Sequence, residues 1–253
     1  MRKSKIIVLS LMVICVLCFA IVAVYFLLLK DNFAEPLNEE TEAAVLQAAG
    51  LVKNGPADAQ TVRTLYLTRI VTRRLNLDSG QLLPAGAPQR GQKRCVDLSP
   101  ALDPAQIRQR CSPVDIYLVR DNNNHIQQLI LPVYGKGAKS MMYALVALDI
   151  DGRTVNDLLY YRQNETPLLG ARVEDPQWRS QWAGKKIRDR QGNPALKVVQ
   201  DNPGQHDVYT VDGISGATLT SSGVGKSINF WMGEQGYGNF LRQLQENPTI
   251  LTQ

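Results

Sequence analysis

The chain of 253 residues has little of the chemistry that hydrolases and nucleotide-binding enzymes use. Its two histidines, His125 and His206, do not stand at a spacing typical of zinc ligands, which argues against a hydrolytic metal centre. The sequence has neither a Gly-x-Ser-x-Gly nucleophile motif nor a Walker motif. It also lacks a strand followed by the glycine-rich turn that binds a dinucleotide. Hydrolysis at a metal or a serine, ATP hydrolysis and dinucleotide binding are therefore not indicated.

A block of one charge sign is also missing. The net charge is +5 and the pI is about 9.0, but acidic and basic residues are mixed along the chain. No segment rich in Lys and Arg with interleaved aromatic residues is present, so we expect no nucleic-acid partner.

Charged residues are absent from Ile6 through Leu29, a run of about 24 residues. At 1.5 Å per residue, a helix of this length crosses the roughly 30 Å hydrocarbon core of a bilayer. A cleaved signal peptide is the alternative, but its apolar region has typically about 7–15 residues, and no small-x-small cleavage site follows Leu29 cleanly. The sequence therefore predicts one transmembrane helix at residues 6–29, in contact with membrane lipid.

The residues that flank this run predict its orientation. Arg2, Lys3 and Lys5 precede it, whereas acidic residues predominate soon after Lys30. Because positively charged flanks stay in the cytoplasm, we expect residues 1–5 to be cytoplasmic and the bulk of the chain to be exported. In a diderm bacterium this is a single-pass protein of the inner membrane with a periplasmic domain.

The four cysteines form two unlike pairs. Cys15 and Cys18 lie within the apolar run on one helix face, where they either pack as apolar residues or supply half of the ligands of an iron–sulfur cluster completed by a partner. Cys95 and Cys111 lie in the exported part, where a disulfide is chemically permitted. Their separation in space cannot be read from the sequence, so both the bonded and the free state stay open.

The pattern of apolar residues predicts the elements that follow. Helices are expected at residues 39–50, 59–75 and 219–232, and strands at 115–120, 126–134, 141–150 and 154–161. Residues 77–113 are rich in Gly, Pro, Asp and Gln, which indicates a long loop with one short helix at 104–110. The order of elements predicts an α+β domain at 114–253, with a mostly antiparallel sheet and flanking helices, after a helical and loop-rich segment at 30–113.

The segment Asp212-Gly213-Ile214-Ser215-Gly216-Ala217-Thr218 is the most informative part of the sequence. Its glycines let the backbone approach a ligand closely, and the predicted helix begins directly after Thr218. A phosphate on Thr218 would lie at a helix N-terminus, where free N–H groups and the positive end of the dipole favour an anion. The alternative is that Ser215 or Thr218 only caps the helix.

This segment resembles the flavinylation motif of bacterial FMN-binding domains, in which a flavin transferase joins the phosphate of FMN to the last threonine. The resemblance implies a covalent phosphoester of FMN on Thr218, with Ser215, Gly216 and Ala217 around it. Because the carboxylate of Asp212 would repel a phosphate beside it, we expect Asp212 to serve Mg²⁺ binding or transferase recognition during attachment rather than to hold the flavin. Residues 114–253 would then be the FMN-binding domain.

A second segment, Glu165-Thr166-Pro167-Leu168-Leu169-Gly170, resembles the Glu-Thr-Pro-Gly-Leu-Gly loop of the same family, which packs against the flavin. The resemblance implies that Glu165 and Thr166 supply polar contacts and that Leu169, beside Gly170, supplies an apolar wall. Leu168 replaces the family glycine, and a positive φ at this position would strain a leucine.

The sequence leaves the role of two other segments undecided. Residues 135–140, with the sequence Gly-Lys-Gly-Ala-Lys-Ser, either bring the backbone close to the flavin or form an ordinary hairpin turn. Tyr160 and Tyr161 either line the pocket or belong to the core.

The resemblance extends along the chain through Ser140–Ala144, Asp175–Arg179 and Gly184–Lys186. In this order the segments resemble the family of C subunits of the Na⁺-translocating NADH:quinone oxidoreductase. The resemblance implies an electron carrier, inactive alone, that relays electrons from a membrane iron–sulfur centre to the FMN of the B subunit. Its partners would be the A, B, D, E and F subunits, especially the B subunit and the D/E pair.

Two other interpretations stay open. One is the G subunit of the related electron-transport complex that couples ferredoxin to NAD⁺, which shares the anchor and the attachment motif. The other is an anchored assembly module without redox function, in which Thr218 is only a helix cap.

Overall fold

The structure is a computed structural model that describes residues 39–52, 58–84, 93–200 and 207–252. The predicted transmembrane helix at residues 6–29, with Cys15 and Cys18, lies outside the described residues. None of the helices in the described ranges is both long enough and apolar enough to span a bilayer.

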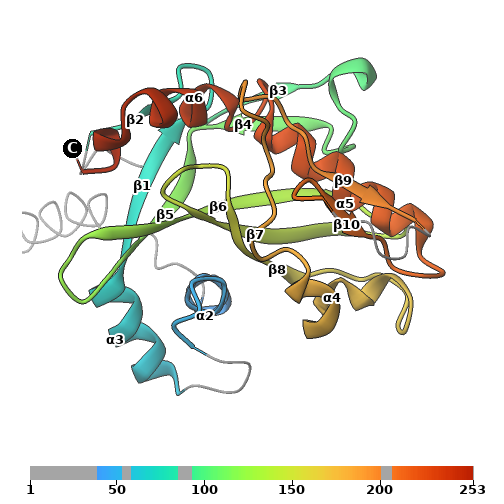
Figure 1. Cartoon of the computed structure of the whole chain (residues 1–253), viewed down its shortest axis with the longest axis horizontal. Coiled ribbons are helices and arrows are strands. Elements are labelled where there is room, and N and C mark those ends of the chain that lie inside the picture. Colours follow the sequence, from blue (N-terminus) through green and yellow to red (C-terminus); the bar gives the residue numbers. More distant parts are fainter. Residues whose placement is uncertain (1–38, 53–57, 85–92, 201–206, 253) are drawn as a thin grey trace, which may run out of the picture. The chain divides into compact units, whose positions relative to one another are not determined.

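An antiparallel sheet forms the centre of the described part of the chain (Figure 1). Its six strands there have the order β2-β1-β5-β6-β7-β8, and every neighbouring pair is antiparallel. The strands are β1 (Ile70–Asn76), β2 (Gln81–Leu82), β5 (Val114–Arg120), β6 (Ile126–Lys136), β7 (Met141–Asp149) and β8 (Val155–Arg162). The two predicted hairpins are thereby confirmed as β5–β6 and β7–β8, and the fold is α+β.

Helices cover both faces of this sheet. Figure 1 shows α5 (Thr218–Met232) and α6 (Gly238–Glu246) on one side and α2 (Glu39–Ala48) and α3 (Ala59–Arg69) on the other. Alternate residues of a strand point to opposite faces. Leu129 and Leu131 of β6 accordingly join Ile228 of α5 in the main core cluster. Tyr160 belongs to the same cluster and is 3% exposed, so its core interpretation is confirmed.

The predicted helix at residues 59–75 is wrong in its second half. Asp58 caps α3 by accepting a hydrogen bond from the N–H of Thr61, and the helix ends at Arg69. Ile70 is already extended, with φ −112° and ψ 130°, and pairs with Val119 of β5. Strand β1 begins with Ile70, Val71 and Thr72, whose β-branched side chains favour a strand. The sequence nevertheless predicted a helix here, because the apolar residues also stand at helical spacing.

The short helix expected at residues 104–110 is also wrong. The chain instead makes a 3₁₀ turn at Pro100–Leu102, and Gln106 and Arg108 have left-handed φ values of 54° and 64°. Both carboxylate oxygens of Asp103 accept backbone hydrogen bonds, from the N–H groups of Ile107 and Arg108. Such a side chain offers the backbone an alternative to helical hydrogen bonds.

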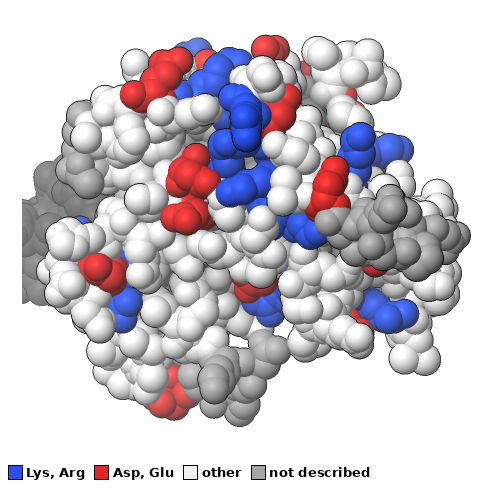
Figure 2. Space-filling view, in the orientation of Figure 1, with Lys and Arg blue, Asp and Glu red and all other residues white. Residues whose placement is uncertain are grey.

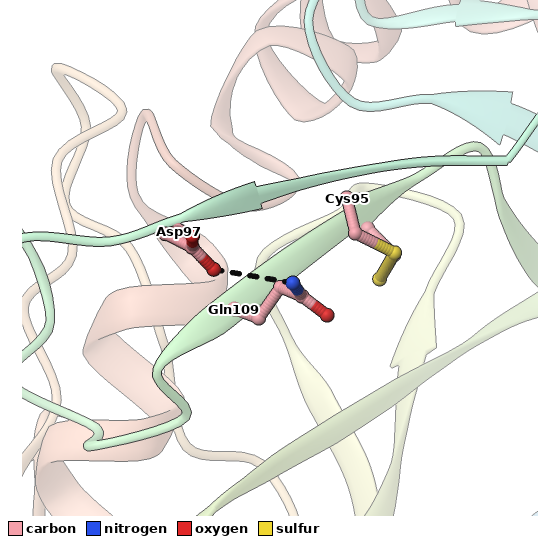
Figure 3. Close-up of a disulfide and its surroundings, with 4 residues drawn as sticks. Cys95, Asp97 and Gln109 are labelled. Atoms are coloured by element: carbon pink, nitrogen blue, oxygen red, sulfur yellow. Dashed lines mark hydrogen bonds between the residues drawn. A yellow bond between two sulfur atoms is a disulfide. The ribbon is translucent and has the colours of Figure 1, made fainter.

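The disulfide between Cys95 and Cys111 is formed, which closes the question that the sequence left open. The two cysteines face each other on the antiparallel ribbon of β3 (Arg94–Asp97) and β4 (Gln109–Ser112). Figure 3 shows the bond next to a second link between the strands, in which Gln109 Nε2 donates to Asp97 Oδ1 at 3.1 Å. Residues 96–110 are thereby held as a closed loop.

Replacing both Cys95 and Cys111 by Ser should lower the free energy of unfolding by about 2–3 kcal/mol, because the disulfide restricts the unfolded chain over a loop of this length. Chemical denaturation of the full chain measures this, and the parent protein with reductant is the matched control. An unchanged denaturation midpoint in both would show that the bond does not stabilise the domain.

Candidate functional site

The segment Asp212–Thr218 connects a short strand to the start of a long helix. Strand β10 (Thr210–Asp212) lies parallel to β9 (Lys197–Val199), and the chain then enters α5 at Thr218. Gly216 has φ +77°, a conformation that a residue with a side chain rarely adopts. The predicted helix is thus confirmed, and the Thr218 side chain lies at its N-terminus, where free N–H groups are available to an anion.

The capping alternative does not hold in this geometry. The N-cap position is occupied by Ala217, which makes no side-chain capping hydrogen bond, and neither Ser215 nor Thr218 holds that position. The Thr218 hydroxyl is exposed and donates one long hydrogen bond, 3.3 Å, to Gln200 Oε1. Thr218 therefore presents a hydroxyl that the helix itself does not use.

Two neighbouring hydroxyls are already in use. Thr220 is 1% exposed, and its Oγ1 donates to Glu165 Oε2 at 2.6 Å. Ser221 is equally buried, and its Oγ accepts the N–H of Ile214 at 2.8 Å. Ser215 and Ser222 are exposed, so the access to a modifying enzyme is limited in this stretch to Ser215, Thr218 and Ser222.

Helix α4 (Pro176–Ser180) and the residue after it, Gln181, hold the beginning of the Asp212–Thr218 segment. Trp178 Nε1 donates to the carbonyl oxygen of Asp212 at 2.8 Å, and Gln181 Oε1 accepts the N–H of Asp212 at 3.0 Å. Asp175 caps α4 by accepting the N–H of Gln177. In the sequence this region stands out only by its resemblance to the family, because no local pattern shows that it contacts Asp212.

The loop Glu165–Gly170, after β8, lies against the Asp212–Thr218 segment. A Cβ on Gly216 would lie 3.2 Å from Leu169 Cδ2, so Leu169 and the Ser215–Thr218 stretch are neighbours. The carbonyl oxygen of Thr166 accepts the N–H groups of both Leu169 and Ala171 at 3.2 Å, which defines the turn. Leu168 has φ +62° and is 88% exposed. Leu168 therefore has a positive φ, which a glycine would adopt without strain.

The carboxylate of Glu165 is committed to donors from the chain. It is 4% exposed and accepts hydrogen bonds from the N–H groups of Ala138, Lys139 and Ser140, at 2.8–3.0 Å, besides the hydroxyls of Ser140 and Thr220. Burial alone would raise its pKa, but the hydrogen bonds from Thr220, Ser140 and Lys139 outweigh burial and lower the pKa to about 2. Glu165 is therefore an ionised, buried anchor of the β6–β7 turn.

A groove of about 490 Å³ runs beside α5 from Thr218. Lys197 and Lys226 line it together with polar and apolar residues, among them Gln200, Ser222, Val198 and Asn229. Asn229 Nδ2 donates to the carbonyl of Leu196, but its buried Oδ1 has no hydrogen-bond partner among the described residues. The volume lies in the range of small-molecule sites, about 300–1,000 Å³. An exposed hydroxyl at a helix N-terminus and two cations that line the groove fit a phosphate-bearing heterocycle such as FMN.

Charge elsewhere on the surface is mixed. Figure 2 shows a band of Lys and Arg side chains on one face with Asp and Glu beside it, as the interspersed charges of the sequence indicated. Within the described ranges, no group of three or more His, Cys, Asp or Glu residues could hold a metal ion.

Comparison with known proteins agrees with this geometry. The family model described as FMN-binding domain matches residues 137–233, which contain both the Glu165–Gly170 loop and the Asp212–Thr218 segment. The fold and the site thus define an FMN-binding domain.

The similarity to individual proteins covers nearly the whole chain. It is 42% identical over 245 residues to the C subunit of the Na(+)-translocating NADH-quinone reductase of Yersinia pestis, covering 94% of this chain and 92% of the relative. Identity to the corresponding protein of Vibrio alginolyticus is 36% over 252 residues, covering 97% and 95%. The crystal structure of Shewanella oneidensis NqrC matches with a TM-score of 0.72 at 30% identity, covering 83% of this chain and 98% of that one. The chain belongs to the family of C subunits of Na⁺-translocating NADH-quinone reductases.

Replacing Glu165 by Gln should lower the melting temperature at pH 7 by several degrees, because unsatisfied buried donors cost about 1–3 kcal/mol. The folded-state pKa is lowered from 4.5 to about 2, so the carboxylate stabilises the fold above pH 4.5 and this contribution is lost as the pH falls towards 2. The difference in melting temperature between parent and variant should therefore shrink between pH 5 and pH 3, as circular dichroism can measure. The same change at exposed Glu246 is the control, and a difference independent of pH would contradict the assignment.

Proposed function

We propose that this chain carries FMN as a phosphoester on Thr218 and acts as an electron-carrying subunit of a Na⁺-pumping NADH:quinone reductase. The single observation that supports this most is the exposed Thr218 hydroxyl at the N-terminus of α5. Membership in the family of C subunits supports the same assignment.

The residues of the chain bind and orient the cofactor. The free N–H groups of the first turn of α5 stabilise the phosphate on Thr218, and Gly216 lets Leu169 approach the attachment segment. Ser215 and Ala217 surround Thr218 in the same segment. Asp212 serves recognition by the flavin transferase, or Mg²⁺ binding, during attachment. Thr166, Leu169 and Gly170 form the wall near the ring, with Glu165 behind them. When bound, FMN supplies the electron-accepting chemistry, and the protein sets its position and environment.

The proposed place of the chain in the complex follows from its family. It relays electrons from an iron–sulfur centre in the membrane subunits to the FMN of the B subunit, and it assembles with the A, B, D, E and F subunits. A flavin transferase attaches the cofactor during maturation.

The proposed location is the bacterial inner membrane, with residues 1–5 in the cytoplasm, one membrane helix at residues 6–29 and the remainder in the periplasm. The disulfide between Cys95 and Cys111 supports export of this part, because disulfides persist in oxidising compartments and are rare in the cytosol.

Thr218→Ala should abolish covalent attachment of FMN, because the variant lacks the acceptor oxygen. The parent chain, produced with a flavin transferase, should gain the mass of one FMN phosphoester and fluoresce in a denaturing gel, and the variant should do neither. Ser222→Ala, which removes an exposed hydroxyl one turn along α5, is the matched control and should remain fluorescent. A fluorescent Thr218→Ala band would overturn the assignment.

Leu169→Gln and Thr166→Ala should shift the flavin midpoint potential by about 20 mV or more without loss of covalent FMN. A hydrogen bond near the ring contributes about 1 kcal/mol, which corresponds to about 20 mV for a two-electron couple. Redox titration at full occupancy measures the shift. Val198→Gln makes the matching change in the groove that Thr218 also lines. If only Val198→Gln changes the potential, the ring lies in the groove and the loop is not its wall.

A further inference from the structure

Three segments that are distant in sequence meet at one carboxylate. Glu165 follows β8, its backbone donors come from the β6–β7 turn, and the hydroxyl of Thr220 comes from the first turn of α5. Thr220 is two residues after Thr218. The hydrogen bond from Thr220 to Glu165 therefore holds the same helical turn that presents the Thr218 hydroxyl. Glu165 thus connects the site to the sheet.

Two glycines let the backbone approach this carboxylate more closely than a residue with a side chain could. A Cβ on Gly137 would lie 2.7 Å from Glu165 Oε1, and a Cβ on Gly170 would lie 2.5 Å from Thr220 Oγ1. Real Cβ atoms do not approach other atoms so closely. The three segments therefore lie at a separation that leaves room for Glu165 and Thr220 and for no further side chain.

Hydrogen bonds compensate the charge of Glu165 without a cation. None of the ion pairs among the described residues includes Glu165, and the ammonium group of nearby Lys136 donates to the carbonyl of Lys139 instead. Three backbone N–H groups and two hydroxyls converge on the two carboxylate oxygens. A carboxamide cannot accept all of them, because one of its two terminal groups is itself a donor.

We propose that Glu165 is a positioning residue for the flavin site. Its carboxylate, through Thr220, fixes the first turn of α5 and therefore the direction in which Thr218 points, and it does so without touching the cofactor. The effect on the flavin rests on the function proposed above, whereas the effect on the protein does not.

The first test uses the full chain without flavin. Hydrogen–deuterium exchange should show that Glu165→Gln and Thr220→Val each speed the exchange of amides 138–140 and of the first turn of α5 at least tenfold, because each change removes an interaction that joins these segments. Thr220→Ser keeps the hydroxyl and should behave like the parent. Glu246→Gln, the same change at an exposed acid of α6, should leave both segments unchanged.

The second test uses the same variants after flavin attachment, with occupancy measured by intact mass. Glu165→Gln and Thr220→Val should change the visible circular dichroism and the midpoint potential of the flavin, and Thr220→Ser should restore the parental values of both. Thr220→Val keeps the shape of the side chain, so it carries the test if Glu165→Gln does not fold.

Three outcomes would overturn the proposal. These are unchanged amide exchange in Glu165→Gln and Thr220→Val, a Thr220→Ser variant that behaves like Thr220→Val, and a flavin signal that is parental in every variant. Failure of the proposed function has a different signature, since the parent itself would then lack flavin while the exchange experiment still reports on Glu165.

Discussion

Helix α5 approaches strand β6 so closely that no side chain fits between them at two points, and the site depends on this contact. A Cβ on Gly223 would lie 2.3 Å from the carbonyl oxygen of Lys136, and one on Gly135 would lie 2.5 Å from Ser227 Cβ. Glycine within a helix costs about 1 kcal/mol relative to alanine. The close packing of α5 on the sheet offsets this cost. It also fixes the position of Thr218 relative to the sheet.

Backbone strain is located where the Glu165–Gly170 loop meets the Asp212–Thr218 segment. Leu168 adopts a left-handed conformation that costs a residue with a side chain about 1–2 kcal/mol, and its side chain gains little from burial because it is 88% exposed. The two hydrogen bonds that Thr166 accepts and the buried Glu165 maintain the turn around it. Strained residues persist where the surrounding structure determines the backbone, and they cluster at functional sites. The turn next to Gly216 is thus set by its surroundings rather than by the preference of leucine.

Local patterns predicted much of the fold and the position of Thr218 at the start of a helix, while long-range contacts could not be predicted. The hairpins and α5 followed from periodicity and turn residues, and the motif around Thr218 is continuous in sequence. Strand β1 was missed because Ile70 and Val71 also fit a helical face, and only pairing with β5 decides between the two. The five donors around Glu165 come from 25 to 55 residues away, so no local signal shows that the acid of the Glu-Thr-Pro loop is buried.

The loop-rich region before β5 is part of the site's surroundings and not only a connection. Pro104 lines the groove beside α5, and the carbonyl of the next residue, Ala105, accepts the N–H of Lys136 at the end of β6. Both residues lie within the loop that Cys95 and Cys111 close, so the disulfide restrains a wall of the groove. Oxidation therefore contributes to the shape of this wall, and a chain folded in a reducing compartment would lack that restraint.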